Sequence, residues 1–116
     1  MIVIVVKHPV RPEYAETWTE VVADFTAATR AEPGCVSFDW YRSTDDPNGY
    51  LLVETFRDAA AGESHVASEH FKQAIARMPD LLAGSPQIVH VELPGEGWSR
   101  MREIAPDAPD GGSGPR

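Results

Sequence analysis

The sequence predicts an α+β fold, a ferredoxin-like βαββαβ domain with an antiparallel sheet, over residues 1–93 of the 116. The first observation is the order of the segments, because strand-like and helical stretches follow one another as β, α, β, β, α, β. The second is that the strand-like stretches carry apolar residues on both faces, although two helices cover only one face of a sheet. We therefore expect a second copy of the chain to cover the other face, which makes a homodimer.

The chain is predicted to begin with a strand and one helix. Residues 2–8 are rich in Ile and Val, which is typical of a strand buried on both faces. Between residues 13 and 31 one apolar stripe recurs at helical spacing, and Pro33 with Gly34 ends the helix. The stripe consists of Tyr14, Trp18, Val21, Val22, Phe25 and Ala28.

A β-hairpin is predicted next, over residues 35–57. Residues 35–42 alternate, with Val36, Phe38 and Trp40 pointing to one side. The loop over 43–49 is dense in turn-forming residues, and the chain then returns as a second strand.

The domain is predicted to close with helical segments and a last strand. Asp58 is placed to cap a short helix over 59–64, and Ser68 to cap a second helical piece. The inner stripe of that piece is Phe71, Ile75 and Met78, and Pro79 helps to end it before a strand over 87–93.

Residues 94–116 differ in composition and are predicted to form a C-terminal extension. Residues 98–104 make a short amphipathic segment in which Trp98, Met101 and Ile104 recur every third residue. Two interpretations remain open: the segment docks on a partner subunit, or it is a loosely held tail with one exposed tryptophan. The remainder, rich in Pro, Gly and Asp, is predicted to be disordered.

Composition and charge narrow the function classes. The net charge of −8 disfavours nucleic acid as a partner, because phosphates attract Lys and Arg. No apolar run approaches the roughly 18 residues needed to span a membrane, so we expect no membrane association. The start of the chain lacks the features of a secretory signal, and the single cysteine, Cys35, excludes an internal disulfide. A cytoplasmic location fits these features.

Short motifs in the middle of the chain resemble the antibiotic biosynthesis monooxygenase family. Glu32-Pro33-Gly34-Cys35 opens a strand, Glu54-Thr55-Phe56 ends another, and His65 and then His70-Phe71 follow. The resemblance covers roughly the first 93 residues. It implies a dimeric α+β barrel and either cofactor-free oxygenase chemistry or a non-oxygenase activity, and it places the first of these histidines at a pocket.

The candidate catalytic residues are His65 and Glu54. An imidazole takes or donates a proton near neutral pH, and His65 lies where the helical pattern is broken. The alternative for His65 is a structural histidine. Glu54 lies on an apolar strand face and needs a partner: either His65, whose tautomer it would set, or Arg42 in a structural salt bridge. The salt bridge is slightly favoured.

The candidate substrate-binding residues are mostly aromatic. Side chains of this kind at helix and strand spacing are often core, but a cavity lined by them suits a flat aromatic or quinone-like ligand. The set is Phe71, His70, Trp40, Phe38, Trp18 and Phe25.

No cofactor and no metal are expected. The chain has no Gly-rich phosphate loop and no dinucleotide-binding fingerprint, and no two histidines fall at a zinc-binding spacing with a third ligand. Haem-degrading relatives of this fold use an asparagine in the first strand and a tryptophan around the second helix, and both are absent here.

Three functions therefore stand as hypotheses. The first is a cofactor-independent monooxygenase that uses O2 on a small aromatic, hydroquinone or polyketide-type substrate. The second is an isomerase of a small carbonyl compound that uses the same pocket. The third is a non-catalytic, ligand-binding or stress-associated dimer.

Overall fold

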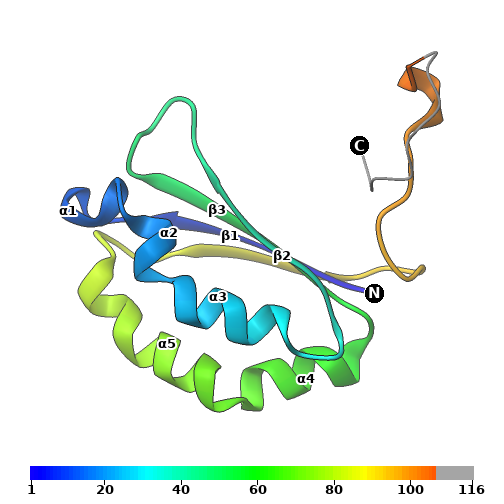
Figure 1. Cartoon of the computed structure of the whole chain (residues 1–116), viewed down its shortest axis with the longest axis horizontal. Coiled ribbons are helices and arrows are strands. Elements are labelled where there is room, and N and C mark those ends of the chain that lie inside the picture. Colours follow the sequence, from blue (N-terminus) through cyan, green and yellow to red (C-terminus); the bar gives the residue numbers. More distant parts are fainter. Residues whose placement is uncertain (107–116) are drawn as a thin grey trace.

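The computed structural model describes residues 1–106, and its centre is a four-stranded antiparallel sheet (Figure 1). The strands lie in the order β2-β3-β1-β4, with β1 and β3 in the middle. Their bounds are Ile2–Pro9 for β1, Cys35–Arg42 for β2, Gly49–Phe56 for β3 and Gln87–Glu92 for β4. This topology confirms the predicted ferredoxin-like α+β fold.

The first helical stretch is broken into three pieces, so the prediction of one continuous helix was wrong. The pieces are α1 (Pro12–Ala15), α2 (Trp18–Val21) and α3 (Ala23–Arg30). The backbone leaves helical geometry at Thr17 and again at Val22, and both residues are β-branched and therefore poor helix formers. The predicted inward stripe survives the breaks, because Trp18 and Val22 are both buried.

The second helical stretch consists of α4 (Ala59–Ala67) and α5 (Glu69–Leu81). Both predicted caps are present, since Asp58 accepts a hydrogen bond from the Ala61 amide and Ser68 accepts one from the Phe71 amide. The predicted end at Pro79 was wrong, because α5 continues through that residue to Leu81.

Arg11 explains how the end of α5 is stabilised beyond Pro79. Its guanidinium donates to the carbonyl oxygens of Pro79 and Leu82, at 3.3 and 3.0 Å, and its backbone amide donates to that of Leu81. These bonds satisfy carbonyl groups that a helix end leaves without partners.

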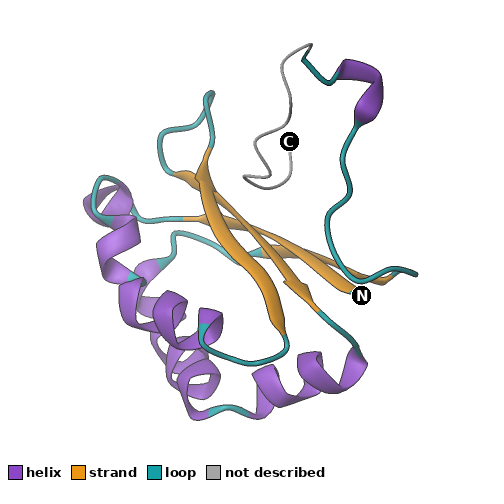
Figure 2. Cartoon of the chain, turned by 45° about the vertical axis from the view of Figure 1, so that its right-hand side comes forward, coloured by secondary structure: helices purple, strands orange, loops and turns teal. Residues whose placement is uncertain are grey.

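The helices α1 to α5 cover one face of the sheet, as Figures 1 and 2 show from two directions. The inward side chains of β1 alternate with outward ones, and β3 supplies the facing positions. The prediction that Val36 points to the same side of β2 as Phe38 was wrong. A β-bulge between Cys35 and Ser37 leaves Val36 41% exposed, whereas Phe38 is buried. The buried inner face includes Ile2, Ile4, Val6, His8, Phe38, Tyr50, Leu52, Glu54 and Phe56.

Within the described part of the chain, none of the helices α1 to α5 lies on the opposite face of the sheet (Figure 2). Val5 of β1 lies between Val53 of β3 and Val89 of β4 in the sheet register, which gives this face an apolar stripe. All six residues of β4 are exposed, and Val89 is 61% exposed. The expectation that a second copy covers this face remains a prediction.

After β4 the chain leaves the body of the domain (Figure 2). The indole of Trp98 donates to the hydroxyl of Ser37 at 3.2 Å, yet Trp98, Met101 and Ile104 are all exposed. Helical structure in this segment is limited to one 3-10 turn, η1 (Arg102–Ile104). Most of the stretch predicted to be disordered lies outside the described residues. Within residues 1–106, no helix has the length and apolar content to cross a membrane.

Candidate functional site

A cavity of about 630 Å³ lies between the inner face of the sheet and α5. Its volume is in the range typical of small-molecule sites. Three of its lining residues are buried and ionisable and come from different elements, His8 from β1, Glu54 from β3 and His65 from α4. Apolar walls surround them, formed by Val6, Phe25, Leu52, Phe71, Ala74, Ile75, Met78, Leu82 and Ile88 among others.

The position of His65 follows from the break between α4 and α5. Ser68 adopts extended backbone geometry between the two helices, and its hydroxyl donates to the His65 carbonyl oxygen at 2.6 Å. In a continuous helix two residues five apart are turned by about 140° from one another. The break removes that constraint, so His65 on α4 and His70 on α5 reach the same group.

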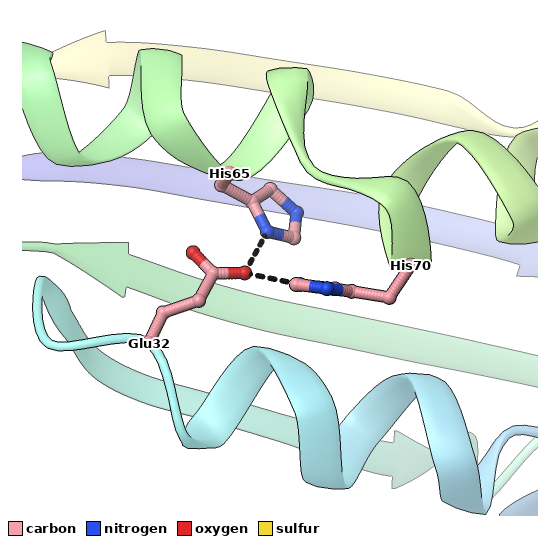
Figure 3. A group of neighbouring side chains, drawn as sticks. All are labelled: Glu32, His65 and His70. Atoms are coloured by element: carbon pink, nitrogen blue, oxygen red, sulfur yellow. Dashed lines mark hydrogen bonds and ion pairs between the residues drawn. The ribbon is translucent and has the colours of Figure 1, made fainter.

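That group is the carboxylate of Glu32, in the loop after α3 (Figure 3). One of its oxygens, Oε2, lies 2.8 Å from Nδ1 of His65 and 2.5 Å from Nε2 of His70. An ionised carboxylate only accepts hydrogen bonds, so we assign both ring nitrogens as donors. In the neutral imidazole this arrangement leaves the proton on Nδ1, and Nε2 of His65 faces Glu54, another residue of the cavity lining.

Glu54 faces that second nitrogen of His65, with 3.7 Å between Oε1 and Nε2. Burial, and then the negative charge of Glu32, raise the pKa of Glu54 to about 7. Both protonation states of Glu54 are therefore populated near neutral pH. The predicted salt bridge to Arg42 was wrong, because Arg42 pairs with Glu16 at 2.8 Å, and the carboxylate that holds the tautomer of His65 is Glu32.

A group of phenylalanines packs around His65. The centroid of the Phe56 ring lies 4.8 Å from that of the imidazole, and the Phe71 ring lies 5.1 Å away. Phe25 and Phe38 follow at 6.0 and 6.2 Å. His65 as a whole is only 2% exposed, so the hydrogen-bonding and proton-transfer partners of its ring are limited to the protein and whatever occupies the cavity.

The predicted substrate-binding residues divide into two groups. Phe25 and Phe71 line the cavity. Phe38 and Trp18 are buried in the core, and the ring of Trp40 packs against both of them. His70 bonds to Glu32 behind His65 and does not line the cavity.

Two ionisable residues of the site were missed from the sequence. Glu32 was interpreted only as part of the Glu32-Pro33-Gly34-Cys35 motif that opens a strand, although a negative charge just beyond a helix C-terminus is electrostatically unfavourable and signals another partner. His8 was taken only as the end of a strand, but it is buried and lines the cavity. Burial lowers the pKa of His8 to about 4, against a smaller opposing effect of the hydrogen bond to the Val6 carbonyl.

A model of the antibiotic biosynthesis monooxygenase family matches residues 1–77. The chain belongs to this family. Family membership agrees with the sheet topology and with the resemblance seen in the sequence.

Known relatives are similar at low identity. The protein sll1783 of Synechocystis sp. is 32% identical over 79 residues, which are 68% of this chain and 54% of that protein. YcnE of Bacillus subtilis is named as a proposed monooxygenase. It is 28% identical to this chain over 93 residues, which are 80% of this chain and 98% of YcnE. This chain thus spans about half the length of sll1783, which is described as uncharacterised.

Solved structures agree on the fold. One structure is of a Caulobacter crescentus protein that is named as a proposed antibiotic biosynthesis monooxygenase. It superposes on this chain with a TM-score of 0.73 at 29% identity. The match covers 79% of this chain and 88% of that one. Rv0793 of Mycobacterium tuberculosis gives a TM-score of 0.72 at 25% identity, over 82% of this chain and 96% of its own.

Proposed function

We propose that this protein is a cofactor-independent monooxygenase of a small aromatic, hydroquinone or polyketide-type substrate. The observation that carries the proposal is the environment of His65, with the Glu32 carboxylate on Nδ1 and the cavity on the side of Nε2. A carboxylate that holds one tautomer of an imidazole leaves the other nitrogen positioned as a general base. Membership of a family described as monooxygenases supports the same chemistry.

The cavity favours an uncharged, flat substrate. Its walls are largely apolar and aromatic, and its lining within the described part of the chain includes no Lys or Arg. A phosphate or carboxylate on the substrate would therefore lack a cationic partner and would face Glu54. A phenol, hydroquinone or anthrone brings apolar rings and an acidic proton, and the volume suits two or three fused rings.

In the proposed reaction, Nε2 of His65 removes a proton from the substrate and leaves an electron-rich carbanion. The carbanion reduces O2 and forms a carbon–oxygen bond, and the proton on His65 returns to give a hydroperoxide. Loss of water from the hydroperoxide gives the quinone, so an anthrone and O2 yield an anthraquinone and H2O. Glu54 in its protonated form is placed to donate to the leaving hydroxide, and the substrate supplies all the electrons.

An isomerase is the second candidate, and the pairing of His65 with Glu54 is the observation that favours it. A base and a carboxyl group 3.7 Å apart at one cavity wall could move a proton between two carbon atoms of a carbonyl compound. Such a reaction consumes no O2. A ligand that stabilises the protein without turnover would instead support a non-catalytic binding function.

An oxygen electrode separates these functions. Anthrone, dithranol and a series of methylated hydroquinones would be tested with the protein in the presence of a chelator, which removes catalysis by free metal ions. The proposal expects O2 uptake in proportion to protein and quinone formation at one equivalent. His90→Ala is the matched control, because His90 lies exposed on β4 and away from the cavity lining. Quinone formation without protein-dependent O2 uptake would overturn the oxygenase proposal.

We also propose that the protein acts as a homodimer, with the helix-free faces of two sheets packed together. Val3, Val5 and Val53 on this face are partly exposed in the single chain, and Val89 and Val91 more so. Covering such a stripe removes apolar surface from water at roughly 25 cal/mol per Å². The cavity lies on the other side of the sheet, so each copy would keep its own His65 and Glu54.

A further inference from the structure

The cluster of Glu32, His65 and His70 has the composition of a metal site. Figure 3 shows the three side chains converging from the loop after α3, from α4 and from the start of α5. Each offers one ligand atom, and these atoms all lie within 4.8 Å of one another. The sequence prediction of no metal site considered only the spacing between histidines. The third group of this cluster is Glu32, 33 residues before His65.

The charges around the cluster favour a cation. Two carboxylates, Glu32 and Glu54, lie on opposite sides of the His65 ring, with side chains that are 14% and 8% exposed. Within residues 1–106, the ion pairs recorded for both carboxylates are with His65 and His70, and Lys and Arg contribute none. A divalent cation beside these side chains would gain favourable electrostatic interactions with the Glu32 carboxylate, which is largely shielded from water.

We propose that Glu32, His65 and His70 bind a divalent transition-metal ion, with Zn²⁺ as the best match. Two imidazole nitrogens and a carboxylate oxygen form an established zinc ligand set, with a water molecule as the fourth ligand. The proposal does not rest on the proposed function, because metal binding is measured without any substrate.

The present distances describe the hydrogen-bonded, metal-free arrangement. Ligand atoms in a tetrahedral zinc site lie about 3.3 Å apart, given bonds of about 2.0–2.1 Å. The Glu32 oxygen lies 2.8 Å from Nδ1 of His65 and 2.5 Å from Nε2 of His70, so the ion must part these atoms by about 0.5–0.8 Å. His70 is the side chain with room to move, because it is 26% exposed while that of His65 is 3% exposed.

Glu54 completes the arrangement around the ion. A histidine that binds a metal through one nitrogen usually donates its other N–H to a carboxylate. Metal at Nδ1 of His65 would place the proton on Nε2, and Glu54 lies 3.7 Å from that atom. The same tautomer change removes the lone pair that would act as the base, so bound metal is expected to block proton abstraction in the cavity.

Metal binding is tested on the tag-free, full-length chain after chelator treatment and desalting. Zn²⁺ would be titrated by calorimetry, and Co²⁺ would report four-coordinate geometry through its visible absorption. The proposal expects a one-to-one complex, weakened at least about 100-fold by Glu32→Gln or by His70→Ala and by about 10- to 100-fold by Glu54→Gln. His90→Ala is the control and should bind as the wild type does.

Two results would overturn the metal site: no one-to-one complex with either ion, or a complex that survives both Glu32→Gln and His70→Ala. Circular dichroism of each variant guards against loss of folding, and His70→Gln offers a milder second variant. A protein that consumes O2 with its substrate but binds no metal would refute this inference alone. A protein that binds metal but turns over no substrate would refute only the proposed function.

Discussion

His8 gives a stability prediction whose size follows from the structure. The imidazole is buried, and its pKa falls from 6.5 to about 4 because burial disfavours the charged form. The unfolded chain therefore binds a proton at a higher pH than the folded one does. Stability from this group is complete above the unfolded pKa and is lost as pH falls toward the folded value, with a limit of about 3 kcal/mol at 1.36 kcal/mol per pKa unit.

The assay is urea denaturation at steps between about pH 7.5 and about pH 4, for the wild type and for His8→Phe. Phenylalanine keeps a ring against Trp40, whose centroid lies 4.9 Å from that of His8, but it does not titrate. Glu54 acts in the opposite direction, because its raised pKa makes the folded state less stable as pH rises from 4.5 to about 7. Both proteins contain Glu54, so subtracting the free energy of unfolding of His8→Phe from that of the wild type at each pH cancels the contribution of Glu54.

The wild type should thus lose more stability on acidification than His8→Phe does, by about 3 kcal/mol at most. Parallel pH profiles for the two proteins would refute the reasoning. They would mean that His8 is hydrated in the folded state, and that the cavity end that it lines is open to water.

Other predictions concern the fold and assembly. Gly34→Ala should destabilise the protein by about 1–3 kcal/mol, since its Cβ would lie 2.3 Å from that of Ala61; Gly84→Ala, with no atom closer than 3.7 Å, is the denaturation control. Light scattering at micromolar concentration should report a dimer, and a monomer would remove the sheet-to-sheet proposal. Truncation after Ala105 should leave the melting temperature unchanged, because the deleted composition supports no core; a large drop would show that this segment is docked.

The sequence predicted the order of elements well because strand alternation and helical stripes are local. Non-local effects were missed. The helix breaks at Thr17 and Val22 were missed because the same apolar stripe also fits a straight helix. The bulge beside Val36 was missed because it depends on how β2 pairs with β3. Arg11, far away in sequence, supports the end of α5 beyond Pro79.

The candidate site was predicted in part. His65 and Glu54 were recognised because each is a polar group in a setting that needs explanation. The pairing of Glu54 with His65 is present, at 3.7 Å between Oε1 and Nε2, but the carboxylate that accepts the hydrogen bond of His65 is that of Glu32. No spacing rule joins Glu32 to His70, because the two meet only when the chain folds and the helix breaks at Ser68.

The central claim is that His65, held by Glu32, is the general base of the cavity. The most direct test compares kcat for O2 uptake by the wild type, His65→Ala and Glu32→Gln, with the best substrate of the panel and a chelator present. The account predicts a loss of roughly 10²–10⁴-fold for His65→Ala, with unchanged folding, and a smaller loss for Glu32→Gln. Turnover by His65→Ala at the wild-type rate would contradict the account.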